Sequence, residues 1–171
     1  VLYIITGGRI QRPFFFKMDV ILIAAVTANG MIAKSHDEII TWSLDLHLFR
    51  KQTTGFPVIM GSNTKKTLAT DLDERQLIVF HRQDDPKEIL SKLDSKKCFI
   101  IGGGKTYSVF APYLTHLYLT PHPLIFGKGI PLFFELDGNL ELNFQTLVEI
   151  DPAKGVYQYQ YKVRRDIHHT R

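Results

Sequence analysis

Cysteine is nearly absent from this chain, which has 171 residues and a single cysteine, Cys98. One cysteine cannot form an intramolecular disulfide, and it cannot supply the cysteine cluster of a structural zinc site. Cys98 stands in a short apolar run, so we expect a small core residue rather than a nucleophile. The composition therefore excludes a disulfide scaffold, and we expect no metal site.

Long apolar runs and a strong excess of one charge are missing too. No run reaches the length that a membrane-spanning helix needs. The net charge is only +4, and no basic stripe is interleaved with aromatic residues. We therefore expect neither a membrane nor a nucleic acid as partner, and the mild positive charge would suit a small anionic ligand. The apolar share of 44% is ordinary for a soluble globular protein. We expect the protein to be cytoplasmic.

The length is close to that of one domain. We expect residues 18–165 to form it, with residues 1–17 as an N-terminal extension or leader and residues 166–171 as a tail. Residues 1–17 lack the basic start and small-residue cleavage site of a secretory signal. Phe14–Phe16 would be unfavourable if exposed, so we expect them to pack on the domain or on a partner subunit, as in a homodimer.

A glycine turn organises the chain. The apolar run Cys98–Ile101 ends on Gly102–Gly104, a helical pattern follows as far as Pro112, and a second apolar run covers Leu117–Thr120. Glycines between a strand and a helix allow close approach of a ligand and direct N–H groups toward it. A phosphate or pyrophosphate is the predicted ligand. The alternative is that the glycines serve only the geometry of the turn.

Strands and helices alternate before this turn. The predicted strands and helices are Asp19–Val26, Thr41–Thr54 (helix), Val58–Met60, a helix capped by Asn63 or Thr64, Arg75–Phe80, a helix from Pro86 to Leu93 capped by Asp84 or Asp85, and Lys96–Ile101. Two alternating runs near the end, Leu142–Ile150 and Val156–Arg164, predict an antiparallel hairpin. The fold class is therefore α/β, with a mostly parallel central sheet and a C-terminal hairpin.

The helix Thr41–Thr54, which Ser43 can cap, carries the candidate acid Asp45. Asp45 and Phe49 share one helix face because they are four positions apart. Asp45 is either a first-turn acid that complements the helix dipole or a half-buried carboxylate beside a ring. In the second case it could bind, or help to protonate, a nitrogen heterocycle.

Three further features are ambiguous. The small residues Ala24 and Ala25 would admit a flat ligand or equally a tightly packed helix. Lys65 and Lys66 stand in a first helical turn, which indicates either a nearby anion or a solvated basic pair. The long loop Thr27–Ile40, with a turn at Asn29-Gly30, is of a kind that often carries function.

In this order and at this spacing, the pieces resemble a dihydrofolate reductase over Asp19 to Arg164. The matching pieces are the Ala24-Ala25 strand, Trp42 with Asp45 and Phe49, Val58-Ile59-Met60-Gly61 with Thr64, the Arg75 strand, Ile101-Gly102-Gly103-Gly104 with Tyr107, and Leu117-Tyr118-Leu119-Thr120. The resemblance is to the bacterial branch, within a superfamily that includes the reductase domain of riboflavin synthesis. It implies the three-layer fold of that family, the cofactor NADPH, and hydride transfer to a pterin.

The resemblance also implies roles for the matched positions. Asp45 and Thr120 would be catalytic; Ile23, Ala25, Phe49, Arg75 and Ile101 would bind substrate; and Ala24, Gly61, Ser62, Asn63, Thr64, Arg82, Gly102, Gly103, Gly104, Lys105, Thr106 and Tyr107 would bind the cofactor. Arg75 would take the carboxylate of the substrate, which suits a guanidinium group. The peptide between Gly102 and Gly103 would be cis.

The chain departs from the family pattern at two places. Ser62 stands where the family often has an arginine for the 2′-phosphate of NADPH. Lys65, Lys66 or Arg82 could compensate, so we expect NADPH, with NADH as the alternative.

The second departure is the segment from Trp42 to Asp45, which is shorter than usual and follows Thr41 rather than proline. If that displaced Asp45, Asp37 or Glu38 would be the replacement acid.

Two other functions remain open from the sequence. A reductase of a ribosylated pyrimidine phosphate would share the fold, the glycine turn and the loop Phe126–Pro131. A non-catalytic nucleotide-binding module would bind the cofactor without turnover, and the presence of Asp45 counts against it.

Overall fold

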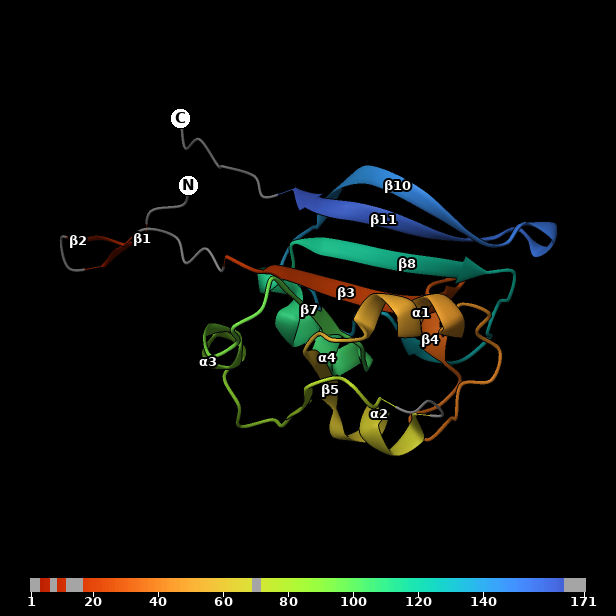
Figure 1. The fold of residues 1–171 in the computed structure, drawn as a ribbon, viewed down its shortest axis with the longest axis horizontal. Helices are drawn as coiled ribbons and strands as arrows, with labels where there is room; N and C mark the ends of the chain where they lie inside the picture. The colour runs from red at the N-terminus through yellow and green to blue at the C-terminus, as the bar shows by residue number, and fades with distance from the viewer. Residues whose placement is uncertain (1–3, 7–8, 12–16, 69–71, 165–171) are drawn as a thin grey trace.

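The computed structural model describes residues 4–6, 9–11, 17–68 and 72–164, and its centre is a seven-stranded sheet with helices on both faces (Figure 1). In spatial order, its strands are β10 (Glu141–Asp151), β11 (Val156–Arg164), β8 (His116–His122), β3 (Asp19–Thr27), β7 (Lys97–Ile100), β5 (Val58–Gly61) and β6 (Leu77–Phe80). The five strands from β8 to β6 are parallel, and β11 and β10 are antiparallel to their neighbours. The predicted fold class is therefore confirmed.

The described helices are short. They are α1 (Leu46–Thr53), α2 (Ser62–Thr67), α3 (Pro86–Ser91) and α4 (Gly104–Phe110), with 3-10 turns at η1 (Ala111–Tyr113) and η2 (Pro152–Lys154). Two small sheets complete the described chain: β1 (Ile4–Thr6) with β2 (Arg9–Gln11), and β4 (Met31–Ala33) with β9 (Ile130–Pro131).

Strand β3 lies inside the sheet and is covered on both faces. Val20 and Leu22 face the core cluster that contains Leu90 of α3 and Phe110 of α4. The alternate residues of β3 face the opposite cluster, against which Phe49 of α1 packs. A continuous apolar run is what a strand buried on both faces requires, so the run from Asp19 to Val26 predicted this element correctly.

The beginnings of two helices differ from the prediction. Helix α1 begins at Leu46 with Asp45 as its N-cap residue, so the prediction of a cap at Ser43 was wrong. The Ser43 hydroxyl instead donates a hydrogen bond to the Asp45 carboxylate. Helix α2 follows Gly61 directly and has no side-chain cap, so the predicted cap at Asn63 or Thr64 was also wrong.

The predictions for the cap of α3 and for the turn after β3 are confirmed. Asp85 caps α3 by accepting a hydrogen bond from the Lys87 amide at 2.8 Å. Gly30 adopts a φ of 82° in the turn after β3, a conformation that favours glycine. The loop that follows contributes β4, which pairs with β9 from the irregular segment after β8. Two loops distant in the sequence are thereby joined.

Cys98 is fully buried in β7, and burial raises the pKa of its thiol to about 12. Its prediction as a core residue is confirmed, because a thiol with that pKa carries little thiolate near neutral pH. Phe14–Phe16, which we expect to pack on the domain or a partner, lie outside the described residues. Within the described ranges, none of the helices has the length and apolar character needed to cross a membrane.

The core predicts a contrast between two neighbours in α4. Phe110 is fully buried, whereas Val109 is 41% exposed. Replacing Phe110 by alanine should lower the free energy of unfolding by about 3–5 kcal/mol, since it leaves a cavity. Val109→Ala should change it by less than about 0.5 kcal/mol. Urea unfolding followed by circular dichroism measures both, and equal losses would contradict this account of the core.

Candidate functional site

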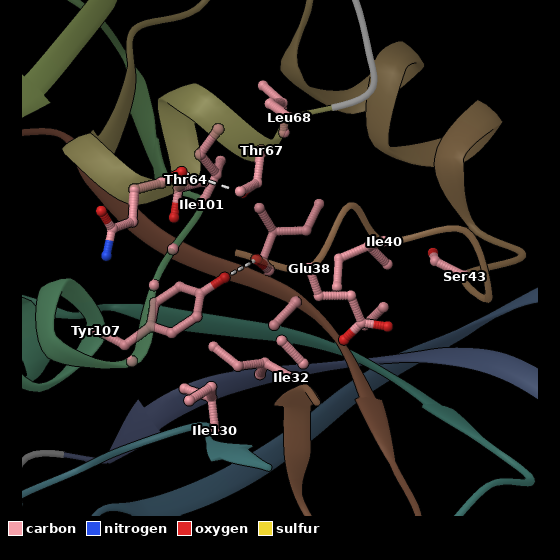
Figure 2. A pocket seen from close by; sticks show the side chains of 18 of the residues that line it. Ile32, Glu38, Ile40, Ser43, Thr64, Thr67, Leu68, Ile101, Tyr107 and Ile130 are labelled. Carbon is pink, nitrogen blue, oxygen red and sulfur yellow. Dashed lines mark hydrogen bonds between the residues drawn. The ribbon is translucent and has the colours of Figure 1, made fainter. Parts of the chain in front are cut away.

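Two adjoining cavities open at the carboxyl ends of the parallel strands. The first has a volume of about 230 Å³ and lies between β3, α1, α2 and the glycine turn (Figure 2). The second, of about 530 Å³, lies between α2, the end of β6 and α4. They share His36, Asn63, Thr64, Gly103 and Gly104 as lining residues. Ligands of open α/β sheets bind at this end of the strands.

The first cavity has largely apolar walls. Of the predicted substrate-binding residues, Ile23, Ala25, Phe49 and Ile101 line it. Ala24, predicted for the cofactor, lines it as well. Figure 2 shows Ile32 and Ile130 on one side of this cavity and Thr64, Thr67 and Leu68 on the other. Walls of this kind fit a flat ring system, which is held chiefly by apolar contact.

Asp45 lies in the wall of the first cavity although its residue is only 6% exposed. In the described chain, its side-chain hydrogen-bond partner is the Ser43 hydroxyl. A carboxylate has two oxygens and can accept several hydrogen bonds, so one serine leaves much of this capacity for a ligand. Because burying a charged group is costly unless it is hydrogen-bonded, a ligand with N–H donors would be strongly favoured here.

Tyr107 of α4 lines the same cavity and fixes its floor, which is the β3 backbone at Ile23. Its hydroxyl donates a hydrogen bond to the carbonyl of Ile23 at 2.8 Å, drawn as a dashed line in Figure 2. Burial, and secondarily the negative charge of Asp45, raises the pKa of Tyr107 well above its usual range. The tyrosine therefore stays neutral and serves as a fixed donor.

Thr120 lies on β8, the strand beside β3 in the sheet. It pairs with Ala25 across β8 and β3, is fully buried, and does not line the cavity itself. Its hydroxyl and the Trp42 indole N–H have no hydrogen-bond partner among the described residues. Buried polar groups are normally satisfied, so these two point to partners supplied by bound water or a ligand.

The second cavity gathers most of the residues predicted for the cofactor. Its lining includes Gly61, Ser62, Asn63, Thr64, Arg82, Gly103, Gly104, Lys105 and Thr106. Gly102 and Tyr107 belong instead to the first cavity. The peptide between Gly102 and Gly103 is cis, as the resemblance implies.

The chemistry of this second cavity fits a dinucleotide. Gly102 has a φ of 131°, and a Cβ there would lie 3.3 Å from the Thr64 hydroxyl, so a side chain would fill the space between the glycine turn and α2, where the two cavities meet. Arg82 and Lys105 bring positive charge for phosphate groups, beside the acids Asp84 and Glu135. Lys65 and Lys66 stand in the last turn of α2, so their predicted place in its first turn was wrong. They are exposed and line neither cavity, which favours their interpretation as a solvated pair.

Arg75 lies at the C-terminal end of α1 and lines neither cavity. Its guanidinium donates to the Thr53 hydroxyl at 2.9 Å and to the carbonyls of Arg50 and Asp73 at 3.0 and 2.7 Å. A further contact reaches the Thr54 hydroxyl at 3.3 Å. The group is thus held in one orientation beside the helix that carries Asp45 and Phe49, and its binding of a substrate carboxylate stays a prediction.

The two replacement acids have different positions. Asp37 is exposed, accepts a hydrogen bond from the Ser35 hydroxyl at 2.7 Å, and does not line the cavity. The bond from Ser35 is the main reason that the pKa of Asp37 lies below its usual value. Glu38 lines the first cavity and accepts a hydrogen bond from the Lys34 amide. Asp45 is the acid buried in the wall.

Sequence reasoning missed several lining residues from the loop after β3. His36 lines both cavities and stacks on Phe134 with ring centroids 6.1 Å apart. Ile32 and Ile40 close the first cavity from the same loop. No local pattern marks these positions; only the length of the loop signalled that it had a role.

Comparison with known proteins agrees with this geometry. A family model described as dihydrofolate reductase matches residues 19–125. The dihydrofolate reductase of Bacillus subtilis (strain 168) is 30% identical over 155 residues, which cover 81% of this chain and 89% of that protein. The dihydrofolate reductase of Haemophilus influenzae is 37% identical over 112 residues, or 58% of this chain and 69% of that protein.

A solved structure shares the fold. The dihydrofolate reductase from Enterococcus faecalis, complexed with NADP(H) and RAB-propyl, superposes with a TM-score of 0.68 at 22% identity. The match covers 90% of this chain and all of that one. With a family model that spans most of the domain and a Bacillus relative that aligns over most of both chains, this protein belongs to the dihydrofolate reductase family.

Proposed function

We propose that this chain reduces 7,8-dihydrofolate to tetrahydrofolate with NADPH. The observation that carries the proposal is the buried Asp45 carboxylate in the wall of a largely apolar cavity, which adjoins a second cavity lined by glycines, Arg82 and Lys105. A pterin ring carries adjacent N–H donors that suit a carboxylate, and the two cavities meet at Thr64 and Gly103. Membership of the dihydrofolate reductase family supports the same reaction.

Asp45 is the central group of the mechanism. Its carboxylate would accept hydrogen bonds from the exocyclic amine and a ring nitrogen of the pterin, which stabilises the protonated ring. Thr120 lies beside Ala25 on the neighbouring strand, and its hydroxyl has no hydrogen-bond partner among the described residues. It would support that contact directly or through water. Solvent supplies the proton, and protonation makes the ring carbon a better acceptor of hydride.

The remaining residues orient the two reactants. Ile23, Ala25, Phe49 and Ile101 would hold the pterin plane, and Tyr107 fixes the backbone of β3 beneath it. NADPH, when bound, supplies the hydride. Ser62, Asn63, Thr64 and Thr106 would donate to its phosphates, with Arg82 and Lys105 as the nearby cations. Most of the rate enhancement would then come from orientation and from the fixed field of the site.

Other readings of the chain are less well supported. A ribosylated pyrimidine as substrate is not favoured, since the family model and the relatives compared above are dihydrofolate reductases. The proposed ligands are small molecules, and a cytoplasmic location accords with them. A homodimer stays a prediction that rests on Phe14–Phe16.

The carboxylate role predicts a selective loss. Asp45→Asn should lower turnover with dihydrofolate by about 10²–10⁴-fold, because the amide cannot stabilise a protonated ring. NADPH affinity, measured by fluorescence titration, should stay unchanged. Asp37→Asn is the matched control, since Asp37 is exposed and outside the cavity, and it should retain wild-type turnover. Wild-type turnover by the Asp45 variant would refute the assignment.

The role of Arg75 predicts a difference between two ligands. Arg75→Ala should weaken binding of dihydrofolate by about 10- to 100-fold, the effect of losing a charged hydrogen bond. A pterin that lacks the glutamate should bind almost as well as before. Calorimetric titration of both ligands tests this. Equal losses for the two would mean that Arg75 only supports the end of α1.

The position of Arg82 predicts cofactor preference. Arg82→Gln should weaken NADPH by about 10- to 100-fold and leave NADH unchanged, because only NADPH has the 2′-phosphate. Lys66→Gln is the control, as Lys66 lies outside both cavities and should alter neither affinity. If Arg82→Gln changed the two cofactors alike, another group would have to select the phosphate.

A further inference from the structure

His122, the last residue of β8, uses both nitrogens of a buried ring. The residue is 2% exposed. Its Nε2 lies 2.9 Å from the backbone nitrogen of Leu44, and its Nδ1 lies 2.8 Å from the carbonyl oxygen of Thr120. The Leu44 N–H can only donate, so Nε2 must accept and the proton must be on Nδ1. The hydrogen-bond pattern therefore assigns a neutral ring in a single tautomer.

His122 thus bridges Leu44 and Thr120. The Leu44 end of this bridge belongs to a segment with few other hydrogen bonds to the rest of the protein. Residues 39–44 form no helix or strand and lead directly to Asp45, the N-cap of α1. In the described part of the chain, the Leu44–His122 contact is the one hydrogen bond that ties residues 39–44 to the central sheet. The Asp45 side chain makes no cap hydrogen bond that would fix it independently.

The Trp42 ring adds a second contact between the same segment and His122. Its ring meets the imidazole edge-on, with centroids 5.2 Å apart and an interplanar angle of 83°. Phe126 holds the indole in a similar way, at 5.5 Å. One histidine thus anchors the segment through both a backbone hydrogen bond and aromatic packing.

The Thr120 end connects the ring to the site. Thr120 pairs with Ala25, which lines the first cavity, and its buried hydroxyl has no hydrogen-bond partner among the described residues. The imidazole consequently links the backbone of Thr120 to the amide that precedes Asp45. The two groups proposed to act on the pterin are connected through a single side chain.

We infer that His122 is a positioning residue, which sets the place of the Asp45 carboxylate relative to Thr120 and the floor of the cavity. The catalytic part of this inference rests on the proposed function, while the structural part does not. A displacement of about 1 Å at a catalytic group can cost about 10²-fold in rate, so one fixed point is enough to matter.

Two substitutions separate the two halves of the bridge. In His122→Gln the longer side chain carries its amide near the Nε2 position, where the carbonyl oxygen can accept from Leu44. In His122→Asn the amide lies near the Nδ1 position, where it can donate to Thr120 but cannot reach Leu44. The two variants are chemically alike, and each keeps one of the two hydrogen bonds: Gln keeps the one from Leu44, and Asn keeps the one to Thr120.

The first test measures the segment itself. Amide hydrogen exchange at Leu44 should become about 10-fold faster or more in His122→Asn and stay near the wild-type rate in His122→Gln. Trp42 is the only tryptophan of the chain, so its fluorescence reports this segment without interference. Both variants lose the ring that packs against Trp42, so its emission should shift further to the red in the Asn variant than in the Gln variant. An unchanged Leu44 rate and emission in the Asn variant would overturn the inference.

The second test measures catalysis. The Asn variant should show a kcat about 10-fold lower or more, an unchanged KM for NADPH, and recovery toward wild type in the Gln variant. A wild-type kcat in the Asn variant would reject the positioning role even if the segment moves. If the wild-type protein does not reduce dihydrofolate, the proposed function fails, and the Leu44 exchange rates still decide whether His122 holds the segment.

A direct measurement covers the case in which the Asn variant does not fold. In the wild-type protein, ¹⁵N spectra of the imidazole should show the proton on Nδ1 and a coupling across the hydrogen bond from Leu44 to Nε2. A proton on Nε2 would exclude the bridge, and with it the inference.

Discussion

The structure depends on one strand that is buried on both faces. Strand β3 separates the two core clusters, pairs with β7 and β8, and ends beside the first cavity. Apolar burial of this kind contributes about 25 cal/mol for each Å² removed from water, without directing where a ligand binds. The place of the ligand site is set by the parallel arrangement of the strands, which brings the end of β3 and the glycine turn after β7 to one edge of the sheet. The small residues Ala24 and Ala25 at that end leave room for a ring.

The site adds an electrostatic constraint to this framework. The Asp45 carboxylate is buried, with the Ser43 hydroxyl as its side-chain partner in the described chain. A threonine hydroxyl and an indole N–H, also buried, lack hydrogen-bond partners among the described residues. Unsatisfied buried groups cost free energy in the protein alone and regain it when a ligand or water completes them. In the proposed function, the Asp45 carboxylate would accept hydrogen bonds from a heterocycle with adjacent donors, and its fixed position would be a form of preorganisation.

Much of this could be predicted from particular residues. The spacing of Asp45 and Phe49 placed both on one wall, and Ile101 followed by three glycines predicted the turn where the cavities meet. The start of α1 was misjudged, because the Ser43 hydroxyl is used by Asp45 rather than by the helix backbone. Local propensity could not distinguish the two possibilities, because a serine hydroxyl can form a hydrogen bond with either a nearby side chain or a nearby backbone group. His36 gave no signal at all, because its role depends on how a loop folds over the sheet edge.

By itself, the sequence determined the order of strands and helices, the glycine turn, the buried character of β3 and the family. The structural features among these are local or periodic, so a few adjacent residues predict each of them, and several such motifs in order indicate the family. Only the tertiary structure decided that Arg75 is held at the end of α1, that Thr120 pairs with Ala25, and that His122 accepts a hydrogen bond from the amide before Asp45. The last of these contacts joins residues 78 positions apart. Such a pairing depends on the register of the sheet and the path of a loop, and neither leaves a periodic mark in the chain.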